Sequence, residues 1–150
     1  MPLHVAVVMG PIGSIRIAKD TTFAMLLEAQ RRGHHLHYVV PGGLGVADGR
    51  SFARSAPLTV RDDPESWYSL GEARSAALSG MDVVLMRRDP PVDAEYLHDS
   101  IVLSMAQAEG VLVANDPAGL RDLNEKLAAL LFPQCCPPTV VSRDFATLRA

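Results

Sequence analysis

HVAVVM at residues 4–9 is a short, nearly uninterrupted apolar run close to the start of the chain. Such a run is typical of a β-strand that is buried on both faces, as the strands of a parallel sheet are. The loop GPIGS at residues 10–14 ends it, and a helical pattern with Asp20 or Thr21 as its N-cap follows. A second apolar run, LHYVV at residues 36–40, comes next. The stretch therefore predicts a strand–helix–strand unit.

The alternation of strands and helices continues in the second half of the chain. Apolar runs at residues 81–86 and 111–114 predict two more strands, and helices are predicted over 93–108 and 117–131. The expected apolar positions of the 93–108 helix are Tyr96, Ile101, Leu103 and Met105. Strands that alternate with helices favour a parallel sheet with right-handed crossovers. The predicted fold class is α/β, a Rossmann-like parallel sheet flanked by helices.

The segment between these two halves departs from the pattern. Residues 44–70 hold short strand-like pieces, and Asp48-Gly49 is a strong hairpin turn signal. We therefore expect a small antiparallel excursion around 44–70, followed by a short helix over residues 72–78.

Composition and charge restrict the class of protein. The 150 residues are 48% hydrophobic and 21% charged, which predicts one folded domain with a full core. A net charge of -3 and scattered basic residues argue against nucleic acid as a partner. No apolar stretch has the length of a membrane span, and no signal peptide precedes the first strand. We therefore expect a cytoplasmic protein with no membrane partner.

The C-terminal part of the sequence carries two further features. Cys135 and Cys136 are adjacent, a spacing that fits neither a disulfide framework nor a Cys-x-x-Cys motif, so we expect two reduced thiols. Residues 137–143 favour an extended segment after a proline break, and residues 144–150 open a helical pattern that stops after a few residues. We expect the chain to end inside a larger polypeptide.

Candidate binding residues follow the predicted strands, because ligands of such sheets bind outside the carboxyl ends of the strands. Arg87 is the first candidate, since its planar fork suits a carboxylate or a phosphate, and Arg88 is the second. The alternative for Arg87 is an ion pair with Asp89 or another acid. Gly13 and Ser14 offer backbone donors and a hydroxyl to an anion.

Other candidate residues have simpler explanations. The loop around Ser14 matches neither Gly-x-Gly-x-x-Gly nor a Walker A sequence, so a plain strand-to-helix turn is its alternative. His35 and His37 share a face of a strand and His34 precedes them, but no third metal ligand is evident, so no metal is predicted there. Lys126, taken by itself, is a surface lysine on a helix.

Three longer stretches together resemble one protein family. FAMLLEAQRRG at 23–33 resembles the first helix of the bacterial glutathione synthetases. MRRDPP at 86–91 resembles the family's Met-Arg-Lys-Asp-Pro-Pro, and LRDLNEKL at 120–127 resembles its Leu-Arg-Asp-x-Asn-Glu-Lys-Leu. The similarity extends from about residue 4 to residue 149. Departures are Gly10, where the family has an Asp, and Arg88, where it has a Lys.

The resemblance implies an ATP-dependent ligase of the ATP-grasp superfamily. Such an enzyme joins γ-glutamylcysteine to glycine through an acyl-phosphate, with ATP and Mg²⁺, and is a homo-oligomer, a tetramer in the family. Residues 1–125 would be the N-terminal pre-ATP-grasp domain, which helps to form the substrate site, and residues 126–150 the start of the ATP-grasp region. Arg87 and Ser14 would then bind substrate, and Lys126 matches a lysine that contacts the nucleotide. The metal ligands would lie outside this chain, so the fragment alone should be inactive.

Two alternatives from other classes stay open at this point. A free-standing nucleotide-binding or flavodoxin-like module would explain the parallel sheet, although the missing phosphate fingerprint counts against it. A domain that serves only assembly would also explain an α/β fold without a recognisable catalytic set.

Overall fold

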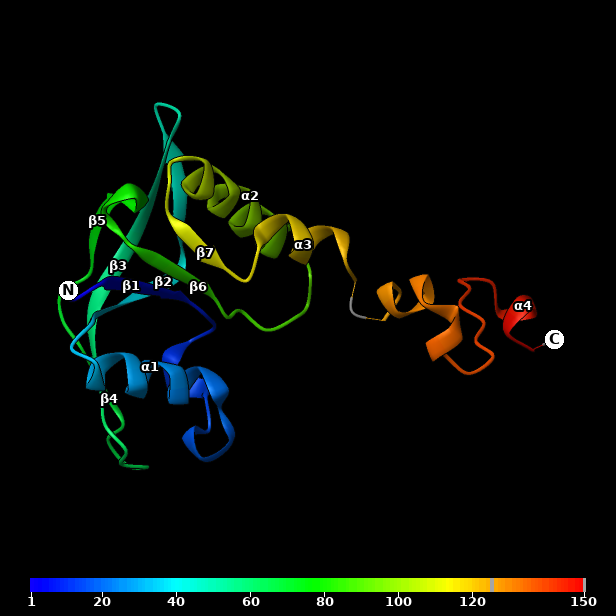
Figure 1. Cartoon of the computed structure of the whole chain (residues 1–150), viewed down its shortest axis with the longest axis horizontal. Coiled ribbons are helices and arrows are strands. Elements are labelled where there is room, and N and C mark those ends of the chain that lie inside the picture. Colours follow the sequence, from blue (N-terminus) through cyan, green and yellow to red (C-terminus); the bar gives the residue numbers. More distant parts are fainter. Residues whose placement is uncertain (125, 150) are drawn as a thin grey trace.

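The computed structural model describes residues 1–124 and 126–149, and these residues form one seven-stranded sheet with helices on both faces (Figure 1). The strands are β1 (His4–Val8), β2 (His35–Ala47), β3 (Arg50–Val60), β4 (Tyr68–Leu70), β5 (Arg74–Ala77), β6 (Val83–Met86) and β7 (Leu112–Ala114). The α-helices are α1 (Thr21–Arg31), α2 (Ala94–Ala108), α3 (Pro117–Asp122) and α4 (Phe145–Arg149). The order in the sheet is β4-β3-β2-β1-β6-β7, with β5 paired to β3.

The centre of the sheet is parallel, which confirms the predicted α/β fold. β1 pairs in parallel with β2 on one side and with β6 on the other, and β6 pairs in parallel with β7. Residues 5–8 are all buried, because Val5 and Val7 face the core under α1 while Ala6 and Val8 face the core under α2. Burial on both faces is the physical reason for the uninterrupted apolar run.

Helix α1 begins as the sequence predicts. The Asp20 carboxylate caps it by accepting a hydrogen bond from the Phe23 backbone N–H at 2.7 Å, and Phe23 and Leu26 are buried against the sheet. The Gln30 side chain donates to the Val60 carbonyl and accepts from the Val60 N–H, both at 2.8 Å. The helix is therefore tied to β3 as well as to β1 and β2.

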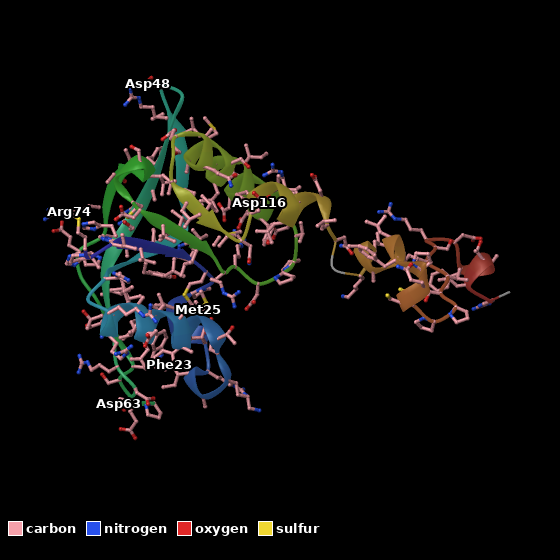
Figure 2. All side chains as sticks on the ribbon, viewed as in Figure 1. Phe23, Met25, Asp48, Asp63, Arg74 and Asp116 are labelled. Atoms are coloured by element: carbon pink, nitrogen blue, oxygen red, sulfur yellow. The ribbon has the colours of Figure 1, made fainter. Side chains whose placement is uncertain are left out.

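The antiparallel excursion is confirmed, and it is larger than a local hairpin. β2 and β3 pair antiparallel around a turn in which Asp48 and Gly49 have positive φ values of 51° and 75°, and Asp48 lies at the protruding tip (Figure 2). The predicted helix over 72–78 is wrong, because Arg74–Ala77 is strand β5, which pairs antiparallel with β3. The backbone N–H and C=O groups of β3 form hydrogen bonds with this segment. This pairing overrides the weak helix propensity of a segment that contains alanines.

Helix α2 spans the predicted residues, but one of its expected core positions is wrong. Tyr96 and Leu103 are buried, Met105 is half-buried, and Ile101 is 54% exposed. The buried side consists of Tyr96, Asp99, Ser100, Val102, Leu103 and Ala106. A helix that covers a sheet turns one stripe toward it, and two polar residues occupy that stripe here while Ile101 lies outside it.

The predicted helix over 117–131 is also wrong in its extent. Helix α3 ends at Asp122, Leu123 leaves helical geometry, and a short 3-10 helix, Ala128–Leu131, follows. Leu123 and Leu131 are 57% and 68% exposed, so these apolar positions gain no burial that would extend the helix. Residue 125 lies outside the described residues, and the predicted domain boundary there stays a prediction.

The end of the chain extends away from the sheet (Figure 1). The predicted extended segment 137–143 forms no strand in the part of the chain that the structure describes. The helical pattern after it is confirmed as α4, where Asp144 accepts a hydrogen bond from the Thr147 N–H at 3.0 Å. None of the helices within residues 1–124 and 126–149 has the length and apolar composition that crossing a membrane requires.

Candidate functional site

The strand order places a topological switch point between β1 and β6. The chain leaves β1 toward β2 on one side, and it leaves β6 toward β7 on the other, so the loops after β1 and β6 diverge. A cavity of about 310 Å³ lies at this edge of the sheet. Its lining comes from the loop after β1, from the bend within β2 at residues 39–44, and from the segment after β6 with the first turns of α2.

The loop after β1 forms one wall, and a buried tyrosine holds it in place. The Tyr38 hydroxyl donates to the Gly10 carbonyl at 3.1 Å and accepts from the Ile12 N–H at 3.2 Å. Burial raises the pKa of Tyr38, so this hydroxyl keeps its proton. Ser14 lines the cavity and donates its hydroxyl proton to the Pro11 carbonyl at 2.6 Å. Ser14 therefore offers a ligand its oxygen lone pairs.

The two arginines after β6 point to opposite faces of the sheet. Arg87 lies beside the first turn of α1, where its Nε donates to the Thr22 hydroxyl at 3.0 Å and its Nη2 to the Thr21 hydroxyl at 2.8 Å. It does not line the cavity. Both partners are neutral, and the alternative ion pair with Asp89 is not formed among the described residues. Arg87 thus forms no ion pair with an acid within residues 1–124 and 126–149.

Arg88 lines the cavity and is surrounded by carboxylates of the α2 segment. Its Nη1 lies 2.7 Å from the Asp99 carboxylate, its Nη2 3.0 Å from Glu95, and the same nitrogen 3.9 Å from Asp93. The side chains of Arg88 and Asp99 are only 22% and 9% exposed. Burial alone would lower the pKa of Arg88, but the hydrogen bonds to Asp99 and Glu95 raise it. The guanidinium is therefore permanently charged and already paired.

The cavity wall next to α2 is acidic in sum. Asp89, Glu95 and Asp99 line it together with Arg88, so acids outnumber the arginine. A ligand group that enters on this side is favoured if it carries a positive charge or donates hydrogen bonds. Arg87 lies at the same edge of the sheet but on the α1 side, where its guanidinium favours an anion. At the ends of these strands, the α2 side is therefore acidic and the α1 side carries the positive charge of Arg87.

A further polar segment at this edge, Asn115-Asp116, follows β7 and has a structural role. The Asn115 amide donates to the Met86 carbonyl at 3.4 Å, across the tips of β7 and β6. Asp116 stands at the start of α3 (Figure 2), where it accepts from the Gly119 N–H at 2.7 Å and from Gln107 at 3.2 Å. Neither residue lines the cavity.

Lys126 lies in a turn beyond α3, and the structure does not bring it to the cavity. The Asn124 side-chain oxygen accepts from the Lys126 and Leu127 N–H groups, each at 3.1 Å. The lysine is exposed, on the segment that extends away from the sheet (Figure 1).

Asp99 and Glu95 were missed by reasoning from the sequence. One signal for Asp99 was present, because it occupies the same helical stripe as Tyr96 and Leu103. A carboxylate on an apolar stripe is buried and needs a partner, and Arg88 is the nearest cation that the preceding strand could deliver.

Comparison with known proteins matches the whole chain to one family. The model of the prokaryotic glutathione synthetase N-terminal domain matches residues 3–121. The glutathione synthetase of Xanthomonas axonopodis pv. citri is 67% identical over 150 residues, which is 100% of this chain and 48% of that protein. That of Pseudomonas putida is 48% identical over 95% of this chain and 45% of its own length, and that of Vibrio cholerae is 43% identical over 99% and 46%. The chain spans about half the length of the curated relatives it matches.

Proposed function

Because the chain belongs to the prokaryotic glutathione synthetase family, we propose that it is the N-terminal, substrate-binding part of an ATP-dependent ligase. That ligase joins γ-glutamylcysteine to glycine through an acyl-phosphate, in the cytoplasm and as a homo-oligomer, a tetramer as in the family. The observation that carries the proposal is the match of all 150 residues to about half the length of glutathione synthetases, together with the match of residues 3–121 to the family's N-terminal domain. The fragment alone is inactive, because about half of each relative lies outside it.

The charge pattern at the switch point supports a role in binding γ-glutamylcysteine. The γ-glutamyl end of this peptide carries both an ammonium and a carboxylate. The acidic wall and the lone pairs of Ser14 suit the ammonium, and the guanidinium of Arg87 suits the carboxylate. Arg87 and Ser14 therefore remain the proposed substrate-binding residues, with Ser14 as an acceptor.

ATP and Mg²⁺ require residues beyond those that bind the peptide. Within residues 1–124 and 126–149, no group of three or more histidine, cysteine or acidic side chains could hold a metal ion. We therefore assign the Mg²⁺ ligands to the rest of the full-length enzyme. When bound, ATP and Mg²⁺ supply the phosphoryl group that activates the substrate carboxylate. Lys126 contacts the nucleotide in that enzyme, where its charge offsets that of the phosphates.

The proposal is tested with the full-length enzyme and an Arg87→Ala variant. Loss of a charge-assisted contact should raise KM for γ-glutamylcysteine by about ten- to a hundredfold, with a much smaller effect on KM for ATP. Arg50→Ala is the matched control, because Arg50 is exposed at the start of β3, beside the hairpin tip, and should keep wild-type kinetics. Unchanged kinetics in Arg87→Ala would remove this residue from the site.

The isolated 150-residue chain gives the second test. It should form no glutathione from γ-glutamylcysteine, glycine, ATP and Mg²⁺, whereas the full-length enzyme does. Robust turnover by the isolated chain would contradict the proposal that catalysis needs residues outside it.

A further inference from the structure

Histidines gather at the edge of the sheet opposite the cavity. The sequence places His34, His35 and His37 together, and the structure adds His4 from the neighbouring strand. Parallel pairing of β1 and β2 sets His4 beside His35 and Ala6 beside His37. Three imidazoles, those of His4, His35 and His37, therefore meet on one side of two paired strands.

Two ring nitrogens in this cluster have the spacing of ligands on one metal ion. His4 Nδ1 and His37 Nε2 are 3.1 Å apart. Two nitrogens that each lie about 2.0–2.1 Å from a Zn²⁺ ion are about 2.9–3.4 Å apart when their angle at the ion is between a right angle and tetrahedral. To bind one ion, each ring must turn its nitrogen lone pair toward a common point. The distance between His4 Nδ1 and His37 Nε2 need change little.

The strands that carry the two histidines are anchored to their neighbours, and the His4 ring is stacked on another ring. The His4 backbone N–H donates to the Asp82 carboxylate at 2.7 Å, and the His35 N–H donates to the Leu3 carbonyl at 2.8 Å. The His35 ring stacks on the His4 ring with centroids 4.9 Å apart. His34 is engaged separately, because its Nδ1 accepts from the Leu3 N–H at 3.2 Å. The pair is therefore presented by anchored strands and a stacked neighbour.

The cluster also has room for the other ligands of a metal ion. A hollow of about 430 Å³ is lined by His4, His34, His35 and His37, and His4 is exposed. No three potential ligands converge on one position in the described part of the chain, so water must complete the coordination. Such a site is a surface chelate with two protein ligands.

We propose that His4 and His37 form a two-imidazole chelate for a divalent transition-metal ion, with Zn²⁺ as its representative. Imidazole nitrogen suits this class of ion, whereas Mg²⁺ prefers oxygen. In the metal-free protein one ring donates a hydrogen bond to the other. In the chelate both offer lone pairs, so His4 carries its proton on Nε2 and His37 on Nδ1. The site is separate from the proposed substrate cavity and does not depend on the proposed function.

Calorimetric titration of the 150-residue chain with Zn²⁺ tests the proposal. The titration is done in the Cys135→Ser/Cys136→Ser background, so that thiolates do not compete for the ion. One site is expected, and His4→Gln and His37→Gln should each weaken it by about a hundredfold, because the second ligand binds intramolecularly. His98→Gln is the matched control, since the His98 side chain is 60% exposed on α2, and it should bind as the parent does.

Histidine ring signals in NMR spectra give a second readout that a mere folding defect would not reproduce. Signals of His4 and His37 should shift together at one equivalent of Zn²⁺, while that of His98 should not. Absence of binding, binding that survives in both His4→Gln and His37→Gln, or loss in His98→Gln would each overturn the proposal.

Discussion

At the scale of single residues, the site depends on two adjacent arginines that face opposite ways. Successive side chains in extended backbone alternate between the two faces of a sheet, so Arg87 reaches the α1 side and Arg88 the α2 side. The sequence predicts a cation at the end of this strand, but it does not say which arginine is neutralised. Which arginine is neutralised depends on Asp99, which lies on α2, eleven residues after Arg88 in the sequence.

Removal of the Asp99 carboxylate should destabilise the protein measurably. Asp99→Ala leaves the largely buried Arg88 guanidinium without its closest partner, which should cost about 1–3 kcal/mol. Glu95→Gln is the control, because the Glu95 side chain is 81% exposed, and its effect should stay within about 0.5 kcal/mol. Urea unfolding measures both. Equal stability of the two variants would show that burial does not strengthen the Arg88–Asp99 pair.

Two glycines that line the same cavity should respond differently to alanine. A Cβ on Gly43 would lie 2.7 Å from the backbone oxygens of Arg54 and Val40, whereas a Cβ on Gly10 would meet nothing within 4 Å. Gly43→Ala should therefore lower the free energy of unfolding by roughly 1–3 kcal/mol. Gly10→Ala should change it by about 0.5 kcal/mol or less. Thermal unfolding monitored by circular dichroism measures both variants. A larger loss of stability in Gly10→Ala than in Gly43→Ala would contradict this prediction.

At the scale of secondary-structure elements, the sequence is most informative where local pattern and burial agree. β1, α1 and β6 could be predicted because both faces of each strand are covered and the helix has a clear cap and stop. β5 could not, because its existence depends on backbone groups of β3 that lie about twenty residues earlier. The short α3 could not either, since an apolar helical pattern is stable only where something packs on it.

The cap of α3 should make stability sensitive to acid. Hydrogen bonds from the Gly119 N–H and from Gln107 lower the pKa of Asp116. A carboxyl whose pKa is lower in the folded than in the unfolded protein contributes stability above its ordinary pKa, and this is lost as the pH falls through the folded value. Asp116→Asn removes the charge and should make the unfolding free energy less dependent on pH below about 4. Urea unfolding from pH 7 down to pH 3 measures the unfolding free energy of both proteins. The same pH dependence in Asp116→Asn and in the wild type would show that the Asp116 carboxylate does not stabilise the fold through its charge.

At the scale of the whole molecule, the chain divides into a packed sheet unit and a segment with few contacts. Residues after α3 expose large apolar side chains, among them Leu131 at 68% and Phe145 at 76%. Among the residues that the structure describes, neither of the two buried clusters includes one beyond Leu120. The charge, composition and motifs of the sequence predict the sheet unit, but the path of this segment depends on surfaces that its residues must meet.

A chain of residues 1–122 should therefore fold as well as the chain of 150. Its Tm is expected to fall by no more than a few degrees, because the deleted residues add little buried area. Limited proteolysis of the longer chain with chymotrypsin should cleave after Leu131 or Phe145, which are exposed, before any site in the sheet. First cleavage within β2 or β3, or a large loss of Tm, would contradict this division.

The central position of β1 has a consequence for synthesis in the cell. β1 leaves the ribosome before both of its neighbours in the sheet, and β6 follows only after the whole antiparallel excursion has been translated. Until then the nascent chain carries an apolar strand with one edge unpaired, which is a template for aggregation. The rate of translation through residues 41–82 thus sets how long that edge of β1 stays unpaired.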